Sequence, residues 1–166
     1  VTVRILQKPE TARAVLIGFP SVEQGGACVA SIIAAGIIPG GLEMMDHPAL
    51  NAAEDFCDAG YPRDVQALLI CELDGPAAEV DHLIGVVGSI ARQHGCTYSK
   101  ASEDEAERLR FWAGRKNAFP AVGRLSPDYL CMDGTIPRGK LAFVLERMQE
   151  MSARHGLRVA NVFHAG

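Results

Sequence analysis

The sequence lacks long hydrophobic runs and paired cysteines. Its longest apolar stretch, residues 27–38, ends before Pro39 and is far shorter than the roughly 20 residues that a membrane-spanning helix needs. No signal peptide is recognisable at the start. The five cysteines stand singly, with no CxxC pair and an odd total, which argues against a disulfide framework and a cysteine metal site. We therefore expect no membrane span, a reducing cytoplasm, and cysteines that serve as small core residues.

Blocks of like charge are also absent. The chain carries 16 Lys and Arg against 20 Asp and Glu, interspersed, for a net charge of −4. Nucleic-acid binding needs a basic footprint that this distribution does not supply. With 48% hydrophobic and 22% charged residues in 166, the composition is that of an ordinary globular domain and excludes a disordered or fibrous chain.

Apolar strands alternate with amphipathic helices from residue 12 onwards. Strands are expected at 14–19, 42–45, 67–73 and 97–99, and helices at 21–35, 49–59 and 76–94. A split βαβ unit repeated twice is the ferredoxin-like arrangement, an α+β fold whose antiparallel sheet carries helices on one face. A parallel doubly wound sheet is the alternative, but no phosphate-binding glycine fingerprint follows any strand.

The last third of the chain predicts one more βαβ unit. Ser102 and Glu105 form a capping box for a helix over residues 103–118. A strand at 129–133, a helix at 139–154 and a strand at 157–164 follow. The helix has an apolar stripe that should pack on a sheet; the stripe consists of Leu141, Val144, Leu145, Met148 and Met151. This third unit has no fourth partner in the chain, and residues 1–6 predict a short strand leading out of something else.

His164 stands at the end of the last predicted strand and is followed only by Ala165 and Gly166. A histidine held at a strand end can bind a metal or move a proton. A turn histidine without a function fits the same spacing. Because one histidine does not make a metal site, we expect the rest of the site beyond Gly166 and the 166 residues to be part of a larger enzyme.

Arg115 lies on the helix predicted over residues 103–118. Arg108, Phe111, Arg115 and Ala118 follow one another at spacings of three or four residues and so form one stripe along the helix. Arg115 therefore shares a face with apolar residues, where a guanidinium could hold a carboxylate through two parallel hydrogen bonds. The alternative is a snorkelling side chain or an ion pair with Glu107 or Asp104.

Glu43 and Asp46 lie near each other in the strand predicted at 42–45 and its end. Side chains alternate between the two faces of a strand, so this pair of carboxylates is not expected to share a side. Asp46 is expected instead to cap the helix that starts at Pro48.

Three stretches together resemble a known family. They are FWAGRK at residues 111–116, YLCMDGTIP at 129–137 and NVFHAG at 161–166. They resemble the C-terminal substrate domain of FAD-linked oxidases of the glycolate oxidase and D-lactate dehydrogenase type, most of all that of the bacterial glycolate oxidases. TVRILQKPE, LEMMD and LLICELDG match as well, so the resemblance covers essentially the whole chain.

The resemblance implies a flavoprotein that oxidises a small 2-hydroxy acid, glycolate or D-lactate, to the 2-oxo acid and passes electrons from FAD to an acceptor other than nicotinamide. FAD would be bound mainly by a flavin domain outside this chain. Residues 1–10 would be a linker strand from that domain, and residues 11–166 an incomplete substrate domain, inactive alone. The substrate carboxylate contact maps onto Arg115, and a divalent metal contact (Zn, Mn or Fe) maps onto His164.

The resemblance also implies partners. These are the protein's own flavin domain, other glycolate oxidase subunits, through which a membrane could be approached, and a second copy in a homodimer. Two departures limit what carries over. The histidine motif stops after HAG, so its second histidine, a later acidic ligand and a proposed base histidine are absent from this chain. Cys131 stands where some relatives have a substrate-contacting lysine, which favours a small substrate such as glycolate.

Two other functions are compatible with the residues. One is a stand-alone ferredoxin-like module that binds a small effector or assembles through its sheet. The other is a folding unit that associates with itself through the strand edge of the unpaired third unit.

Overall fold

The computed structural model describes residues 2–3, 5, 8–126 and 128–165. Its strands form one sheet in the order β4-β1-β3-β2-β5 with antiparallel pairing throughout. The strands are β1 (Thr11–Phe19), β2 (Gly41–Asp46), β3 (Ala67–Gly75), β4 (Tyr98–Ala101) and β5 (Val162–His164). The order of β1 to β4 is that of a split βαβ unit repeated twice. The α+β class and the ferredoxin-like core are confirmed, and the parallel alternative is wrong.

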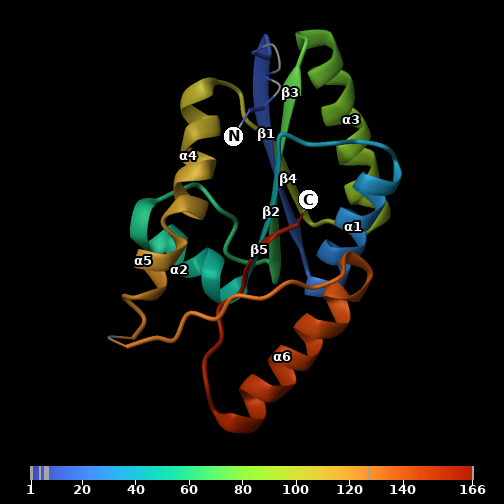
Figure 1. Ribbon diagram of the computed structural model, residues 1–166. Coiled ribbons are helices and arrows are strands. Elements are labelled where there is room, and N and C mark those ends of the chain that lie inside the picture. Colours follow the sequence, from blue (N-terminus) through green and yellow to red (C-terminus); the bar gives the residue numbers. More distant parts are fainter. Residues whose placement is uncertain (1, 4, 6–7, 127, 166) are drawn as a thin grey trace.

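Helices cover both faces of the sheet. One face carries α1 (Val22–Ala34), α3 (Ala77–Gln93) and α6 (Leu141–His155); the other carries α2 (His47–Cys57), α4 (Glu105–Lys116) and α5 (Ala118–Val122). Figure 1 shows the sheet edge-on between these two groups. The helices α1 and α3 are the pair that the ferredoxin-like prediction places on one face, and the second layer of helices is an addition to it.

The central strands are almost continuous hydrophobic runs because the sheet is buried on both sides. In β1, Val15 and Ile17 belong to the core beneath α1 and α3, whereas Leu16 belongs to the core beneath α2 and α4. Polar side chains on either face of these strands are therefore exceptional, and each one needs a partner.

Two of the three predicted helix starts are confirmed. The side chains of Ser21 and Asp46 cap α1 and α2. The third prediction is wrong, because Ser102 is buried and its Oγ accepts a hydrogen bond from the backbone N–H of Ala14 at 3.1 Å. The N-cap of α4 is Asp104, so the helix begins later than the sequence predicted.

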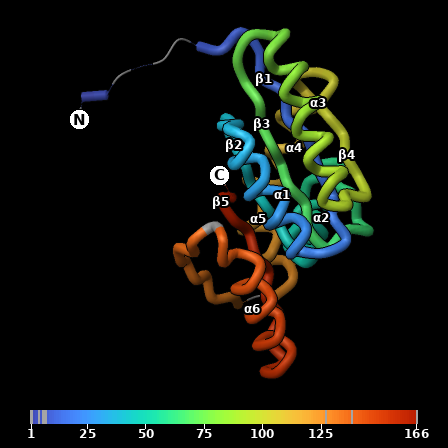
Figure 2. The backbone as a smooth tube through the Cα atoms, turned by 90° about the vertical axis from the view of Figure 1, so that its right-hand side faces the viewer, coloured from blue at the N-terminus to red at the C-terminus, as the bar shows by residue number. Residues whose placement is uncertain are grey.

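The predicted third βαβ unit forms only in part. Residues 129–133 are described and form no strand, and a short 3-10 turn, Arg138–Lys140, precedes α6. The place beside β2 is taken by β5, so the backbone of 129–133 has no strand edge there to pair with. The apolar stripe of α6 was expected to pack on the sheet but lies mainly against α1, and its last member, Met151, is exposed. Figures 1 and 2 place α6 at one end of the molecule.

The remaining sequence predictions have mixed outcomes. The opening strand at residues 1–6 includes positions outside the described residues. Cys28 and Cys71 are buried in the core, Cys57 and Cys96 are half-buried, and all five thiols are free. The core prediction is wrong for Cys131, which is exposed. Within the described parts of the chain, no helix has the length and apolar character needed to span a membrane.

Candidate functional site

The two residues that the sequence singled out meet on one carboxylate. Oε1 of Glu43 lies 2.7 Å from Nδ1 of His164, and Oε2 of Glu43 accepts a hydrogen bond from Nε of Arg115 at 3.0 Å. Nη2 of Arg115 is also 3.0 Å from the same oxygen. We call Glu43, Arg115 and His164 the Glu43 cluster. Its members come from β2, α4 and β5.

The strand register brings His164 to Glu43. The two residues are directly opposite each other in the antiparallel pairing of β2 with β5. Side chains at opposite positions project from the same face of a sheet, with their Cβ atoms about 5 Å apart. This is the face that α2 and α4 cover, so Glu43 emerges beneath α4 while His164 stands at the outer edge.

The helix α4 brings Arg115 to the same place. Phe111, one turn earlier, is fully buried, and the side chain of Arg115 is only 14% exposed, so the predicted shared stripe is confirmed. The ion pair that was the alternative does form, but its partner is Glu43. The two partners that the sequence suggested have other contacts. Glu107 pairs with Lys100, and the carboxylate of Asp104 accepts a hydrogen bond from the helix backbone.

Two other residues of the FWAGRK motif, Trp112 and Gly114, allow α4 to approach the sheet closely. Trp112 lies over Gly41, where an added Cβ would stand 2.9 Å from the indole ring. The indole N–H of Trp112 donates to Glu72 on β3. Gly114 faces Tyr61, whose ring occupies the space that a Cβ at 114 would need. Two features of the sequence could have indicated these contacts. Gly114 lies inside a helix, and Glu72 is an acidic residue in an apolar strand.

A second carboxylate ties α4 to the sheet. Glu72 accepts hydrogen bonds from Arg108 and Trp112, and Arg108 also pairs with Glu105 on its own helix. The hydrogen bonds from Arg108 to Glu105 and Glu72 raise the pKa of its guanidinium. Sequence reasoning named neither Glu72 nor Glu43 as a partner of α4.

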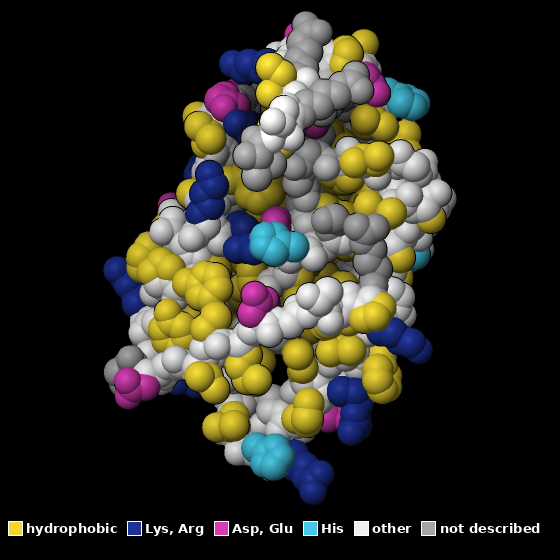
Figure 3. Space-filling model, in the orientation of Figure 1, with side chains coloured by type: hydrophobic (Ala, Val, Ile, Leu, Met, Phe, Trp, Pro, Cys, Tyr) yellow, Lys and Arg dark blue, Asp and Glu magenta, His cyan; other side chains and the backbone are white. Residues whose placement is uncertain are grey.

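The electrostatics of the Glu43 cluster favour one form of the histidine. An ionised carboxylate can only accept hydrogen bonds, so the proton of a neutral His164 lies on Nδ1 and the lone pair on Nε2. The His164 side chain is 83% exposed, whereas that of Glu43 is 12% exposed. In Figure 3, a histidine near the middle of the visible face lies against one acidic and one basic side chain. A histidine whose second nitrogen is held by a carboxylate is the usual arrangement of a metal ligand.

The described residues do not form a complete metal site. Among them there is no group of three or more His, Cys, Asp or Glu side chains that could hold a metal ion. Arg115 directs Nε and Nη2 at Glu43, which leaves Nη1, on the other edge of the planar guanidinium, for a second acceptor. The cluster can thus offer one imidazole nitrogen and one guanidinium edge to a ligand.

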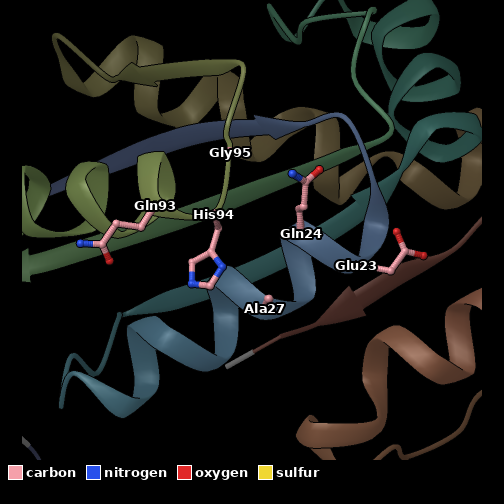
Figure 4. A pocket seen from close by; sticks show the side chains of 6 residues that line it. All are labelled: Glu23, Gln24, Ala27, Gln93, His94 and Gly95. Atoms are coloured by element: carbon pink, nitrogen blue, oxygen red, sulfur yellow. The ribbon is translucent and has the colours of Figure 1, made fainter.

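Two hollows elsewhere on the surface do not resemble a site. The larger, of about 440 Å³, lies between the start of α1 and the end of α3. Figure 4 shows its Gln93 and Glu23 side chains pointing away from each other rather than converging. A smaller one, of about 190 Å³, lies between α6 and the end of β2. Neither is lined by a residue of the Glu43 cluster.

Comparison with known proteins gives a consistent result. A family described as FAD linked oxidases, C-terminal domain, matches residues 8–166. Glycolate oxidase subunit GlcD of Escherichia coli is 59% identical over 166 residues, which are 100% of this chain and 33% of that protein. The GlcD subunit of Bacillus subtilis is 29% identical over 164 residues, 99% of this chain and 35% of that protein. The mitochondrial D-lactate dehydrogenase [cytochrome] of Kluyveromyces lactis is 27% identical over 159 residues, covering 91% and 28%. The chain spans about a third of the length of these relatives.

Solved structures share the fold. Two crystal structures of an alkyldihydroxyacetonephosphate synthase superpose with TM-scores of 0.62 and 0.63 at 14% sequence identity. They cover 89% of this chain, which corresponds to 32% and 30% of those chains. At this identity the likeness concerns the fold alone.

Proposed function

The chain belongs to the FAD linked oxidases, as their C-terminal domain, and from this premise we propose that it is the substrate-side part of a flavoprotein that oxidises a small 2-hydroxy acid to the 2-oxo acid. The names of its relatives, glycolate oxidase subunit and D-lactate dehydrogenase, support glycolate or D-lactate as the substrate. The observation that carries the proposal is the Glu43 cluster, which brings a guanidinium edge and an imidazole nitrogen to one place.

The proposal divides the work between this chain and the rest of a longer protein. Residues 1–10 serve as a linker, and residues 11–166 form the substrate domain. A separate flavin domain binds most of the FAD. The start of the family match at residue 8 and the coverage of a third of each relative support this division. We expect the 166-residue chain alone to be colourless and inactive.

Arg115 is proposed to hold the carboxylate of the substrate. A guanidinium fixed on one edge by Glu43 offers its other edge at a defined angle, which orients the hydroxyl-bearing carbon for reaction. Arginine is suited to this task because its planar donors match the two oxygens of a carboxylate. Cys131 is exposed in a stretch without regular structure and supplies no second cation at its position.

His164 is proposed to contribute one ligand, through Nε2, to a divalent metal such as Zn, Mn or Fe. The remaining ligands would come from parts of the longer protein that this chain does not cover. When bound, such a metal lowers the pKa of a coordinated hydroxyl group. FAD, when bound, accepts the two electrons that leave the hydroxyl-bearing carbon. The residues of this chain bind and orient the substrate.

The partners are proposals as well. The word subunit in the names of the relatives supports assembly with other glycolate oxidase subunits. A homodimer that pairs sheet edges would use short strands, because the edge strands β4 and β5 have four and three residues. Sedimentation of the longer protein, alone and with candidate subunits, measures both associations.

Kinetics of variants in the longer protein test the role of Arg115. Replacing it by lysine removes the fork of donors but keeps the charge, so we expect kcat/KM for glycolate to fall by roughly 10- to 100-fold, from the loss of about 1.5–3 kcal/mol of charged hydrogen bonding. The matched control is Arg108→Lys, on the same helix but bound to Glu72, which should change kcat/KM by only a few fold.

Two outcomes would count against the proposal in different ways. If Arg115→Lys retained the normal kcat/KM, the carboxylate contact would be wrong. If neither glycolate nor D-lactate reduced the flavin of the unsubstituted longer protein, the oxidation of a 2-hydroxy acid itself would be wrong.

A further inference from the structure

Glu43 is unusual among the acidic residues of this chain because its two oxygens serve two different functional side chains. Oε1 faces Nδ1 of His164, and Oε2 receives the Nε and Nη2 edge of Arg115. Its own side chain is 12% exposed and it stands between the buried residues Leu42 and Met44 on β2. The backbone of β2 therefore fixes where the carboxylate emerges, and Arg115 of α4 holds one of its oxygens.

We propose that Glu43 is a positioning residue that presents His164 and Arg115 together. It holds the imidazole in the tautomer with the proton on Nδ1, so that Nε2 faces outward as a ligand. It also fixes the plane of the guanidinium, so that Nη1 is left for a second acceptor. This inference rests on the proposed function, in which these two side chains contact the metal and the substrate carboxylate.

The tautomer matters because an exposed neutral imidazole in water prefers to carry its proton on Nε2. A ring in that form has no lone pair at Nε2 for a metal. A carboxylate acceptor at Nδ1 reverses this preference and also stops the ring from rotating. His164, with 83% of its side chain exposed, has a strand backbone and Glu43 to hold it. Without Glu43 it would lose its side-chain partner.

Glu72 provides the contrast that makes the inference testable. It lies on the neighbouring strand β3, is similarly covered at 18% side-chain exposure, and also ties α4 to the sheet. Its hydrogen-bond partners are Arg108 and Trp112, and among the described residues it forms no hydrogen bond with a member of the Glu43 cluster. A purely structural role for Glu43 would make the two carboxylates equivalent.

The first test reads the tautomer of His164 directly. Long-range ¹H–¹⁵N correlation spectra of the 166-residue chain with ¹⁵N-labelled histidine, at a pH where imidazole is neutral, distinguish protonated from unprotonated ring nitrogens. We expect protonation at Nδ1 in the unsubstituted chain. A proton on Nε2 there would overturn the inference without any variant.

Variants then assign the cause. In Glu43→Gln, the donors of Arg115 should hold the amide oxygen and turn the amide NH₂ toward His164, so that Nδ1 becomes an acceptor and the proton moves to Nε2. Glu43→Ala should release the ring to the preference of free imidazole, which is also Nε2. The matched control Glu72→Gln should leave the proton on Nδ1. Backbone amide spectra check that each variant is folded. An unchanged tautomer in a folded Glu43 variant would overturn the proposal.

A second readout uses the metal alone. Addition of Zn²⁺ to the metal-free longer protein, followed at the ring signals of His164, should give an apparent Kd raised by roughly 10- to 100-fold in Glu43→Gln, as is typical when the carboxylate behind a metal-bound histidine is lost. Glu72→Gln should match the unsubstituted protein. Equal Zn²⁺ affinity in all three proteins would contradict the positioning role.

The two proposals fail separately. If the longer protein oxidised glycolate while His164 carried its proton on Nε2, the positioning role would be wrong and the proposed function would stand. If the tautomer and Zn²⁺ measurements came out as expected but the longer protein oxidised no 2-hydroxy acid, the proposed function would be wrong and the positioning role of Glu43 would stand.

Discussion

At the residue scale, acidic side chains on otherwise apolar strands carry many of the polar contacts between the sheet and its surroundings. Glu43 and Glu72 hold α4, and Asp46 joins the end of β2 to α2 and to the chain before β5. Each has at least one buried residue directly beside it in the chain. Burying a charge without partners is costly, and each of these carboxylates has at least two hydrogen-bond partners.

Asp46 is the most buried of the three, with 5% exposure. Its carboxylate accepts from the backbone N–H of Ala49 at 3.1 Å and from the backbone and side-chain nitrogens of Asn161 at 2.9 and 2.7 Å. Burial raises its pKa from 3.8 to about 6, and the three hydrogen bonds oppose this by lowering the pKa.

The raised pKa predicts a pH dependence of stability. The folded state binds a proton at Asp46 more tightly than the unfolded chain does, so this group stabilises the fold below about pH 4, and the contribution is lost as the pH rises through about 6. The two-unit shift corresponds to about 3 kcal/mol. Denaturant titrations between about pH 4 and pH 7 should show the unsubstituted chain losing stability relative to Asp46→Asn, which has no titrating group. Parallel curves would contradict the prediction.

The sequence located Arg115 and His164 but not the residue that joins them. The spacing of residues on a helix shows that Arg115 shares a face with apolar residues. The alternation of side chains along a strand shows which residues of that strand point to opposite faces of the sheet. Neither tells which strand lies beside β2. The role of Glu43 as their shared partner follows only from the pairing of β5 with β2 and from the contact of α4 with β2.

At the element scale, α4 shows how a helix can be shaped by what it crosses. Phe111 enters the core, Trp112 covers Gly41, and Gly114 makes room for Tyr61. Two of these contacts use a glycine where a Cβ would collide, once on the helix and once on the strand. Close approach of α4 to the sheet is what allows Arg115 to reach a carboxylate on β2.

Two helix-interior glycines should respond to alanine in opposite directions. Gly114→Ala should lower the free energy of unfolding by about 1–3 kcal/mol, because its Cβ would overlap the ring of Tyr61. Gly85→Ala, in α3, meets nothing within 4 Å among the described residues and should raise it by about 0.5–1 kcal/mol through helix propensity. Denaturant unfolding measures both. A stabilising Gly114→Ala would show that α4 can retreat from the sheet without cost.

Element predictions failed where a partner was missing or a competing bond was available. Residues 129–133 have a strand-like sequence, but a strand exists only with a neighbour to receive its backbone hydrogen bonds. Ser102 has the sequence context of a helix cap, but its hydroxyl oxygen instead accepts a hydrogen bond from the backbone N–H of Ala14 in β1. Both outcomes depend on residues far away in the sequence.

At the scale of the whole molecule, the sheet separates two hydrophobic cores and its stability is uneven. The strands β1 and β3 lie at inner positions with buried residues on both faces. The helix α6 lies at one end, with only Leu141 and Leu145 buried along its described length (Figure 2). The edge strand β5, which carries His164, pairs with the sheet on one side only.

Hydrogen exchange should follow this division. Amides in β1 and β3 should exchange only through global unfolding, and amides in α6 through local opening at a lower free energy, because few buried apolar contacts resist its detachment. Native-state exchange at low denaturant measures both by mass spectrometry or NMR. Equal opening free energies in β3 and α6 would mean that the chain unfolds as a single cooperative unit.

The sequence by itself determined the ferredoxin-like order of elements, the family, and the two residues of interest, because periodicity, helix signals and local motifs are properties of neighbouring residues. Tertiary structure alone decided that helices cover both faces, that residues 129–133 remain without a strand partner, and that Arg115 and His164 share Glu43. These outcomes depend on which segments compete for the same strand edge and on how closely a helix approaches it. Distances between segments far apart in the chain settle such competition, and a linear pattern does not contain them.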